Sequence, residues 1–491
     1  MSTNMSTNKG SLGLGSGKGL FRRLPIEQLV EPTPTGPGGL VRSLSLFQLT
    51  AIGVGGIIGA GIFSLAGVVA NEYAGPAVLI SFLIAGVASA AAAFSYAEFA
   101  GLIPRAGSAY TYGYAVLGEV VGWCIGWDLL LEYTAIVAVV AIGISGYFNY
   151  LVQQIGLELP SWMLGAPGTG PGHRVDLFAV ALCLFIAWLL TQGIRNAARF
   201  ETFVVGLKVA VVLIIILFGV FHIRSSNYTP FMPYGIGGAF TGAATVFFAV
   251  FGYDAMSTAA EESKESQKHM PKAIILSLVI AMVLYILACL VLTGMVHYTN
   301  IDTKSPFASA FSSVGMSWLG IIIAAGAIIG ILTVMFTFML GVTRVWFSMS
   351  RDGLLPKYFS KTSDKHHVPV RVTWIVGVAS AVLAGFVNIS VAAELTNIGI
   401  LSAFIVVCIA VVVLRYRRPD LKREFKCPWM PVVPAIGVIA SIWLITYLKW
   451  ETWVRFAAWF VVGLIIYFVY SRRHSRLATQ ETAAPVEASE S

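Results

Sequence analysis

One stretch decides how this chain folds: Gly53-Val54-Gly55-Gly56-Ile57-Ile58-Gly59-Ala60-Gly61-Ile62-Phe63, in which five of the nine positions from 53 to 61 are glycine. Each glycine disfavours a helix by about 1 kcal/mol relative to alanine. The stretch therefore predicts a helix that is interrupted inside an apolar segment. Close helix packing through small residues, such as the Gly55–Gly59 pair, is the alternative explanation, and it accounts for two glycines better than for all five.

Composition indicates where this interrupted helix lies. Apolar residues make up 57% of the 491 positions and charged residues only 11%, against about 25% charged in an average soluble chain. We therefore expect an all-α polytopic membrane protein. Twelve apolar segments are long enough to cross about 30 Å of hydrocarbon, at 45–70, 76–100, 117–153, 175–194, 201–223, 237–262, 272–296, 316–349, 371–388, 393–415, 430–449 and 453–471.

The basic residues predict the orientation. With the N-terminus inside, 26 of the 32 Lys and Arg residues fall in cytoplasmic segments or helix ends and five fall outside, which is a strong positive-inside signal. The net charge of +8 is then topological, and no nucleic-acid partner is expected. We predict a multi-pass protein of a bacterial inner (plasma) membrane, in contact with membrane lipid. Its disordered tails, 1–40 and 476–491, are both cytoplasmic.

An interrupted helix inside a membrane has a chemical consequence. Unwound backbone is tolerated there only where it lines a protein or water cavity. The N–H groups that start the second half-helix attract a carboxylate, and the carbonyls that end the first half attract a cation. The break at 53–63 is thus suited to the two charged groups of a zwitterionic α-amino acid.

A second irregularity occurs in the sixth segment, Phe247-Phe248-Ala249-Val250-Phe251-Gly252-Tyr253-Asp254, where glycine and a carboxylate interrupt an aromatic-rich run. Transporters built from inverted repeats place interrupted helices at matching positions of the two halves. The first and sixth segments are five helices apart, as a five-plus-five repeat requires.

Ionisable residues inside membrane segments are costly and usually functional. Asp128 and Glu132 are four positions apart and share one helical face, although one of them could pair structurally with a hydroxyl or amide. For Asp254 the alternative to a functional role is that its side chain caps a helix end. Lys208 either snorkels to the cytoplasmic interface or needs an acceptor inside the bundle, which the carbonyls of the broken first helix would provide. In the second case Lys208 is a candidate for exchanging a proton during transport.

These residues resemble the amino acid–polyamine–organocation (APC) superfamily, through the stretch 53–63 together with Ala74-Gly75-Pro76. Further motifs resemble its cationic amino acid transporter branch, as found in bacteria, and the resemblance extends from about residue 40 to 475. These motifs are Ser95-Tyr96-Ala97-Glu98-Phe99, Pro104-Arg105-Ala106-Gly107-Ser108-Ala109-Tyr110, Gly126-Trp127-Asp128-Leu129-Leu130-Leu131-Glu132-Tyr133, Ser350-Arg351-Asp352-Gly353-Leu354-Leu355-Pro356 and Glu394-Leu395-Thr396-Asn397-Ile398-Gly399.

The resemblance implies a LeuT-like five-plus-five inverted repeat with discontinuous helices 1 and 6. The repeats are expected at 41–224 and 225–416, and peripheral helices 11 and 12 at 417–475. The implied activity is import of L-amino acids by proton-coupled symport with alternating access. The proton gradient would drive it without a cofactor, and a small membrane accessory subunit remains open. An exchanger for basic amino acids or polyamines is the nearest alternative, and a channel a remote one. The sequence has no HExxH-type histidine pair, nucleophile elbow, phosphate loop or metal-ligand cluster, so we expect no enzyme.

The resemblance also implies roles for individual residues. Lys208 matches the fifth-helix lysine that occupies the place of a sodium ion in sodium-coupled relatives, and Glu132 matches an acid beside the pocket. Asp254 would stabilise the unwound sixth helix or shape the lower pocket. The α-carboxylate and α-ammonium would be held by backbone at two sets of positions, Ile57, Gly59, Ala60 and Gly61 in the first helix and Phe248, Ala249 and Phe251 in the sixth.

One position departs from the cationic pattern. Phe338 aligns with the side-chain pocket, where a small residue would leave room for arginine or lysine. Phenylalanine removes that room. The sequence therefore favours a neutral or broad range of amino acids, with basic amino acids the next candidates.

Overall fold

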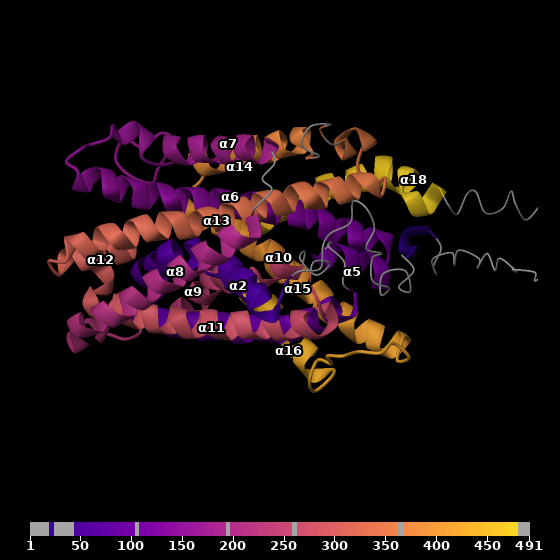
Figure 1. The fold of residues 1–491 in the computed structure, drawn as a ribbon, viewed down its shortest axis with the longest axis horizontal. Coiled ribbons are helices and arrows are strands. Elements are labelled where there is room, and N and C mark those ends of the chain that lie inside the picture. The colour runs from indigo at the N-terminus through magenta and orange to yellow at the C-terminus, as the bar shows by residue number, and fades with distance from the viewer. Residues whose placement is uncertain are drawn as a thin grey trace, which may run out of the picture.

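The computed structural model describes residues 19–23, 44–103, 108–192, 197–257, 263–361, 363 and 368–479. All regular secondary structure in this described part is helical (Figure 1). Seven helical runs are long and apolar enough to cross a membrane, namely Leu46–Leu102, Glu119–Gln154, Thr202–His222, Ser266–Met295, Ser317–Arg351, Ile389–Arg417 and Trp450–Thr479. Four shorter apolar helices accompany them, at Leu177–Thr191, Gly235–Val250, Val370–Phe386 and Val432–Thr446.

Helices occupy each of the predicted apolar segments, as far as the structure describes them. The first segment begins with α2 (Leu46–Ile57) and continues through η2 (Gly61–Leu65) and α3 (Ala66–Val69), and the sixth is formed by α9 (Gly235–Val246), η8 (Phe247–Val250) and α10 (Tyr253–Ser257). The other segments hold α4 (Val78–Leu102), α6 (Glu119–Gln154), α7 (Leu177–Thr191), α8 (Ala197–Gly219), α11 (Ser266–Met295), α13 (Ser317–Arg351), α14 (Val370–Phe386), α15 (Ile389–Arg417), α16 (Val432–Thr446) and α17 (Trp450–Ile466).

Local sequence signals explain where several helices begin. Ser45 and Gln48 form a reciprocal capping box at the start of α2, which satisfies backbone donors that have no partner within the helix. Asp176 and Asn388 cap α7 and α15 more simply, since each side chain accepts one backbone N–H group of the first turn. The third and eighth segments are long, as predicted: α6 has 36 residues and α13 has 35. At 1.5 Å per residue both exceed the thickness of the hydrocarbon layer.

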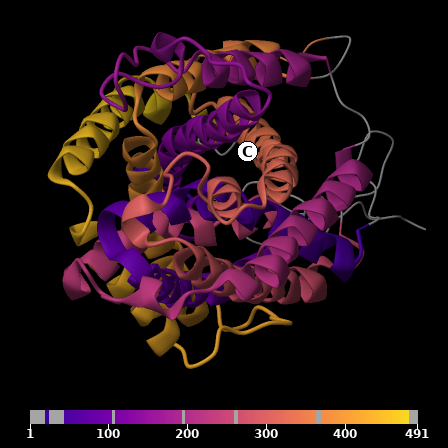
Figure 2. The same cartoon turned by 90° about the vertical axis from the view of Figure 1, so that its left-hand side faces the viewer.

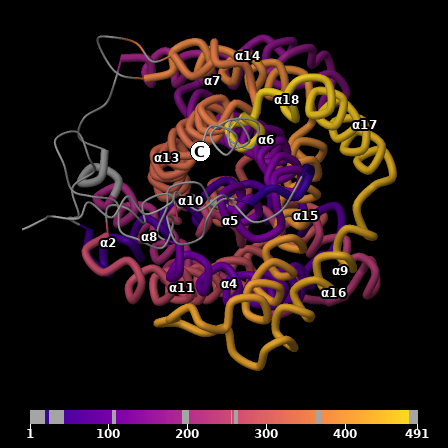
Figure 3. The backbone as a smooth tube through the Cα atoms, turned by 90° about the vertical axis from the view of Figure 1, so that its right-hand side faces the viewer, coloured from indigo at the N-terminus to yellow at the C-terminus, as the bar shows by residue number. Residues whose placement is uncertain are grey.

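The long helices run roughly along one axis, and the end views show them arranged around it (Figures 2 and 3). α6 packs against α13, α14 and α15, whereas α11 packs against α2, α4 and α8. The short helices η1 (Gly19–Phe21) and α18 (Arg472–His474) lie at one end of the bundle, and α12 (Pro306–Ser313) lies at the other. The two interrupted helices are enclosed between these groups.

The predicted terminal tails lie mostly outside the described residues. Within them, residues 19–21 and 476–479 are helical. The predicted boundaries of the two repeats remain predictions, because the helices follow one another without a break in packing that would mark a domain.

At the end of the bundle that carries η1 and α18, residues of the sequence motifs form hydrogen bonds and ion pairs that connect separate segments. Buried Glu98 accepts hydrogen bonds from Arg415 and from the Cys427 N–H group (2.7 Å), and it forms an ion pair with Arg423 at 3.0 Å. The Tyr110 hydroxyl donates to Asp352 at 2.8 Å. These contacts indicate a structural role for two motifs that the sequence alone marked only by resemblance.

Candidate substrate site at two interrupted helices

The first interruption lies within the glycine-rich stretch, as the sequence predicts. α2 ends at Ile57, and Ile58 is extended, with φ −73° and ψ 104°. The chain returns to helical geometry at Ala60 and passes through the π-helical η2 into α3. Ile57, Gly59, Ala60 and Gly61, the predicted contact positions of the first helix, therefore border or form the unwound segment.

Close packing accompanies the interruption, so both explanations of the glycines hold. A Cβ atom added at any of the five glycines would lie 3.0 Å or less from an atom of another segment. Each glycine faces a different neighbour. These are Ser277 for Gly53, Val205 for Gly55, Gly252 for Gly56, Val334 for Gly59 and Ala249 for Gly61.

The second interruption lies in the sixth segment. α9 passes into the 3-10 helix η8, Phe251 is extended with φ −107° and ψ 165°, and α10 starts at Tyr253. Gly252 between them has φ +127°, a conformation that residues with a side chain rarely adopt. Phe248, Ala249 and Phe251, the predicted contact positions, are all buried here.

The two interruptions touch each other through backbone. A Cβ at Gly252 would lie 2.5 Å from the carbonyl carbon of Gly56, and a Cβ at Gly61 would lie 2.5 Å from the Ala249 Cα. Only glycine at these positions permits that approach. Segments separated by nearly two hundred residues in the sequence thus form one continuous unwound region.

Lys208 reaches this region from α8. Its side chain is fully buried, and Nζ donates to the carbonyl oxygens of Gly55 at 2.6 Å and Ile58 at 3.1 Å, and to the Thr333 hydroxyl at 3.1 Å. The carboxyl end of a helix carries partial negative charge, which favours a cation there. Lys208 does not reach the surface, so the snorkelling alternative is disfavoured.

Neutral donors satisfy other backbone carbonyls near the interruptions. The Tyr285 hydroxyl donates to Ile57 O at 2.7 Å, and the Ser89 hydroxyl donates to Val250 O at 2.9 Å. The Asn397 amide donates to Ala244 O and Thr245 O at 2.8 and 2.9 Å. Sequence reasoning missed Tyr285 and Ser89, because a single hydroxyl in an apolar helix carries no signal, whereas Asn397 stood in a motif without an assigned role.

Three acidic side chains lie along α6 and α10. Asp254 accepts a hydrogen bond from Tyr133, the neighbour of Glu132. Glu132 is fully buried, and neither of its carboxyl oxygens has a hydrogen-bond partner within the described part of the chain; the same is true of Asp128 Oδ1. Burying a polar group without a partner is costly. The structural alternative, pairing with a hydroxyl or amide, is therefore not realised at Glu132.

Phe338 stands where the sequence predicts a wall of the side-chain pocket. It projects from α13, is buried, and packs edge-on against Tyr133 with ring centroids 5.1 Å apart. Its centroid lies 6.4 Å from that of Phe251, which belongs to the second interruption. An aromatic side chain thus borders the unwound region on the α13 side.

In the residues that the structure describes, the chain is all-helical, with seven long apolar helical runs and two interrupted helices in backbone contact, which defines a multi-pass membrane protein. Residues 44–482 match the model of the amino acid permease family, and the chain belongs to this family, within the APC superfamily. The expected membership is confirmed.

Individual relatives support this placement. The chain is 44% identical to the methylthioribose transporter of Bacillus subtilis over 458 residues, covering 93% of this chain and 99% of the relative. It is also 44% identical to the branched-chain amino acid permease BcaP of the same organism over 461 residues, with the same coverage. The vacuolar cationic amino acid transporter 4 of Arabidopsis thaliana is 37% identical over 408 residues, covering 82% of this chain and 68% of that protein. These relatives are transporters and not enzymes.

Proposed function

We propose that this protein is a secondary active transporter that imports neutral L-amino acids together with protons across the plasma membrane by alternating access. The observation that carries the proposal is the backbone contact between the two interruptions, with the Lys208 ammonium bound to the carbonyls of the first one. Membership of the amino acid permease family supports amino acids as the general class of substrate.

In this proposal the substrate lies at the unwound region. Backbone at Ile57, Gly59, Ala60 and Gly61 would bind the α-carboxylate and part of the α-ammonium. Carbonyls near Phe248, Ala249 and Phe251 would bind the remainder of the ammonium. Helix starts favour anions and helix ends favour cations, so two interruptions side by side suit a zwitterion. Asp254, which accepts a hydrogen bond from Tyr133, would stabilise the unwound sixth helix at the start of α10.

Lys208 is the proposed coupling residue. An ammonium can release its proton, and release would remove the charge that binds Gly55 O and Ile58 O. The first half-helix would then be freer to move during alternating access. Glu132 of α6 is buried without a hydrogen-bond partner in the described part of the chain, and it is a candidate to take part in proton exchange.

Phe338 supports a neutral substrate. Its ring fills space beside Tyr133 and Phe251 that the guanidinium of an arginine substrate would need. The similarity to BcaP agrees with this preference, and the equally similar methylthioribose transporter offers a second neutral solute. Methylthioribose has no α-amino or α-carboxyl group, so it would leave the helix-end charges of both interruptions unused.

We further propose that the fold is a LeuT-like inverted repeat of twelve spans with both termini inside. The helical run Leu46–Leu102 covers two predicted spans, and the four shorter apolar helices supply four more. The described terminal segments lie at the same end of the bundle, which agrees with an even number of crossings.

The test is uptake by purified protein in liposomes with acid outside. We expect labelled L-leucine to accumulate above its external concentration, and collapse of the pH gradient to abolish accumulation. Uptake that requires an internal amino acid and ignores the gradient would identify an exchanger instead. L-Arginine and methylthioribose serve as competing solutes, and stronger competition by either one would overturn the neutral amino acid assignment.

A further inference from the structure

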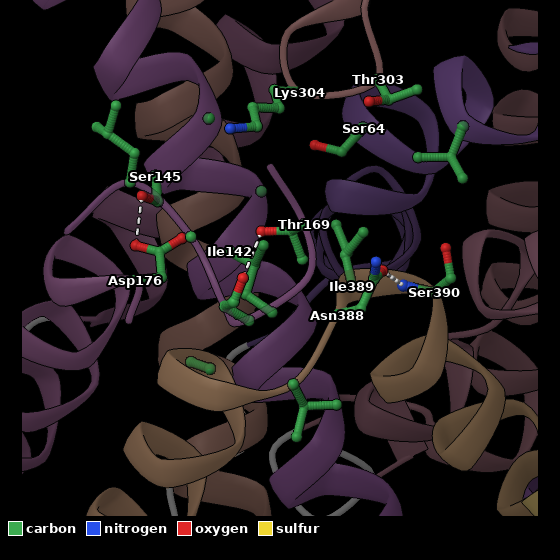
Figure 4. A pocket seen from close by; sticks show the side chains of 18 of the residues that line it. Ser64, Ile142, Ser145, Thr169, Asp176, Thr303, Lys304, Asn388, Ile389 and Ser390 are labelled. Atoms are coloured by element: carbon green, nitrogen blue, oxygen red, sulfur yellow. Dashed lines mark hydrogen bonds between the residues drawn. The ribbon is translucent and has the colours of Figure 1, made fainter. Parts of the chain in front are cut away.

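A pocket lies beside the first interrupted helix, toward the end of the bundle opposite the described terminal segments. We call it the distal pocket; it encloses about 130 Å³ between η2, α6, the loop before α7, the loop before α12 and the start of α15. Its polar and charged lining includes Glu72 and five residues labelled in Figure 4, namely Ser64, Ser145, Thr169, Asp176 and Lys304.

The distal pocket carries both signs of charge. The Asp176 side chain is 4% exposed, and its Oδ1 accepts from Ser145 Oγ at 2.6 Å and from the Ala179 N–H group at 3.0 Å. These donors fix the direction of the carboxylate.

Lys304 supplies the positive charge from the loop before α12. Its backbone is held in place, because its N–H group donates to Asp302 at 3.0 Å and its carbonyl oxygen packs against Gly146 of α6. Within the described residues, no carboxylate lies within the 4.0 Å of its ammonium that an ion pair requires. The ammonium and the Asp176 carboxylate therefore lie in one pocket without neutralising each other directly.

Ser64 lines the pocket from the first interrupted helix. It is 1% exposed, and its hydroxyl has no hydrogen-bond partner in the described part of the chain. Other buried helical serines, such as Ser81 and Ser95, donate to the carbonyl four residues earlier, which is the usual solution in a helix. A side chain at Gly143 would lie 2.9 Å from Ser64 Oγ, so glycine there keeps the space beside the hydroxyl open.

The pocket borders the first interrupted helix, because a side chain at its lining residue Gly143 would lie 3.3 Å from the Ala60 Cβ. Ser64 lies three residues beyond Gly61, but the neighbouring Phe63 is fully buried between the rings of Tyr147 and Phe307. The Tyr147 hydroxyl also donates to Phe63 O. The Phe63 ring is therefore held by aromatic packing, and it does not line the distal pocket.

The size of the pocket limits its ligand. A cavity of about 150 Å³ holds benzene, which has six heavy atoms. The pocket is slightly smaller, so it fits a molecule of about that size, such as alanine or the part that all α-amino acids share. The Ser64 hydroxyl, the Lys304 ammonium and the carboxylates of Asp176 and Glu72 offer groups complementary to both charges of a small zwitterion.

From these observations we propose that the distal pocket is a second binding site for the amino acid, occupied before the substrate reaches the interruptions. The α-ammonium would face Asp176, the α-carboxylate would face Lys304, and Ser64 would complete the hydrogen bonding. The inference rests on the proposed function, since it needs amino acid substrates and entry from the end opposite the termini.

The test counts bound molecules. Purified full-length protein in lipid nanodiscs is saturated with radiolabelled L-alanine, and the same preparation is assayed for uptake in liposomes. We expect two molecules per wild-type chain and one in Asp176→Asn and Lys304→Gln. Asparagine retains the oxygen that caps α7, so the D176N change removes charge without removing the cap. We expect the KM for L-alanine uptake to rise about ten- to hundredfold in K304Q, and K304R to restore it.

Arg174→Gln is the matched control for K304Q, because it also removes one positive charge. Arg174 is two residues from Asp176 in the sequence and does not line the pocket. The R174Q protein should bind two molecules. One bound molecule in wild type with intact uptake would overturn the inference alone and leave the distal pocket a water-filled entrance. Unchanged stoichiometry and KM in D176N and K304Q would also overturn it. No binding and no uptake of any amino acid in wild type would instead overturn the proposed function.

Discussion

At both interruptions side chains donate hydrogen bonds to backbone carbonyls near the break in the helix, but the donors differ in charge. At the first, a charged ammonium, that of Lys208, binds the carbonyls of Gly55 and Ile58. At the second, the neutral donors Asn397 and Ser89 bind the carbonyls of the sixth segment. A neutral donor cannot respond to a proton gradient, whereas an ammonium can. Under the proposed function, the donor to the backbone carbonyls can therefore respond to a proton gradient at the first interruption, while both interruptions hold substrate.

The largest effect is expected where the two interruptions touch. In Gly252→Ala the new Cβ would meet the Gly56 backbone at 2.5 Å, at a residue whose φ is +127°. A side chain in that conformation costs about 1–3 kcal/mol before any clash is counted. We expect a lower melting temperature, little folded protein after purification and no uptake.

Gly206→Ala is the control for this change. Nothing lies within 4 Å of a Cβ at Gly206, which sits in the middle of α8. Alanine favours a helix by about 1 kcal/mol over glycine, so melting temperature and uptake should stay at or above the wild-type level. Normal uptake by G252A would show that the two interruptions do not depend on their close contact.

The second largest effect is expected at Lys208. Replacing it by alanine leaves Gly55 O and Ile58 O without the ammonium, and a hydrogen bond to a charged group contributes about 1.5–3 kcal/mol. We expect K208A to remain inserted, to lose gradient-driven accumulation of L-leucine and to retain exchange of internal for external leucine. Accumulation at the wild-type level would remove Lys208 from the coupling mechanism.

A smaller effect is expected at Asn397, the counterpart at the second interruption. Asn397→Ala leaves Ala244 O and Thr245 O without their amide donor, at a cost of about 1–3 kcal/mol. Uptake should fall, while its dependence on the pH gradient should remain that of the wild type. Uptake by N397A that no longer depends on the gradient would mean that the two interruptions are not chemically distinct.

The smallest effect on overall transport is expected at Phe338. Phe338→Leu makes room beside Tyr133 and Phe251, and one methylene in an apolar pocket changes discrimination by at least about tenfold. Competition assays should show a gain of about that size for long side chains, arginine included, relative to leucine. An unchanged order of competitors would place the side-chain pocket elsewhere.

The sequence predicts the first interruption well, because the helix penalty of its glycines is local. The second interruption has the single Gly252, and its position depends on backbone contact with Gly56 that no local pattern reveals. For Lys208 the sequence left two alternatives, an ammonium at the membrane interface or one bound to an acceptor inside the bundle. Only the fold decides whether the side chain reaches the surface. Tyr285 was beyond prediction, because its hydroxyl matters only for the carbonyl that packing brings to it.

The central claim is that the two interruptions together hold the α-amino and α-carboxyl groups of the substrate. The most direct measurement is a thermal-shift comparison of L-leucine with 4-methylpentanoate, which lacks the amine, and 3-methylbutylamine, which lacks the carboxylate. A ligand that binds the folded state raises its melting temperature. We predict that leucine raises it and that neither analogue does at the same concentration. The claim would be contradicted if either analogue raised the melting temperature as much as leucine does. It would also be contradicted if methylthioribose raised it and leucine did not.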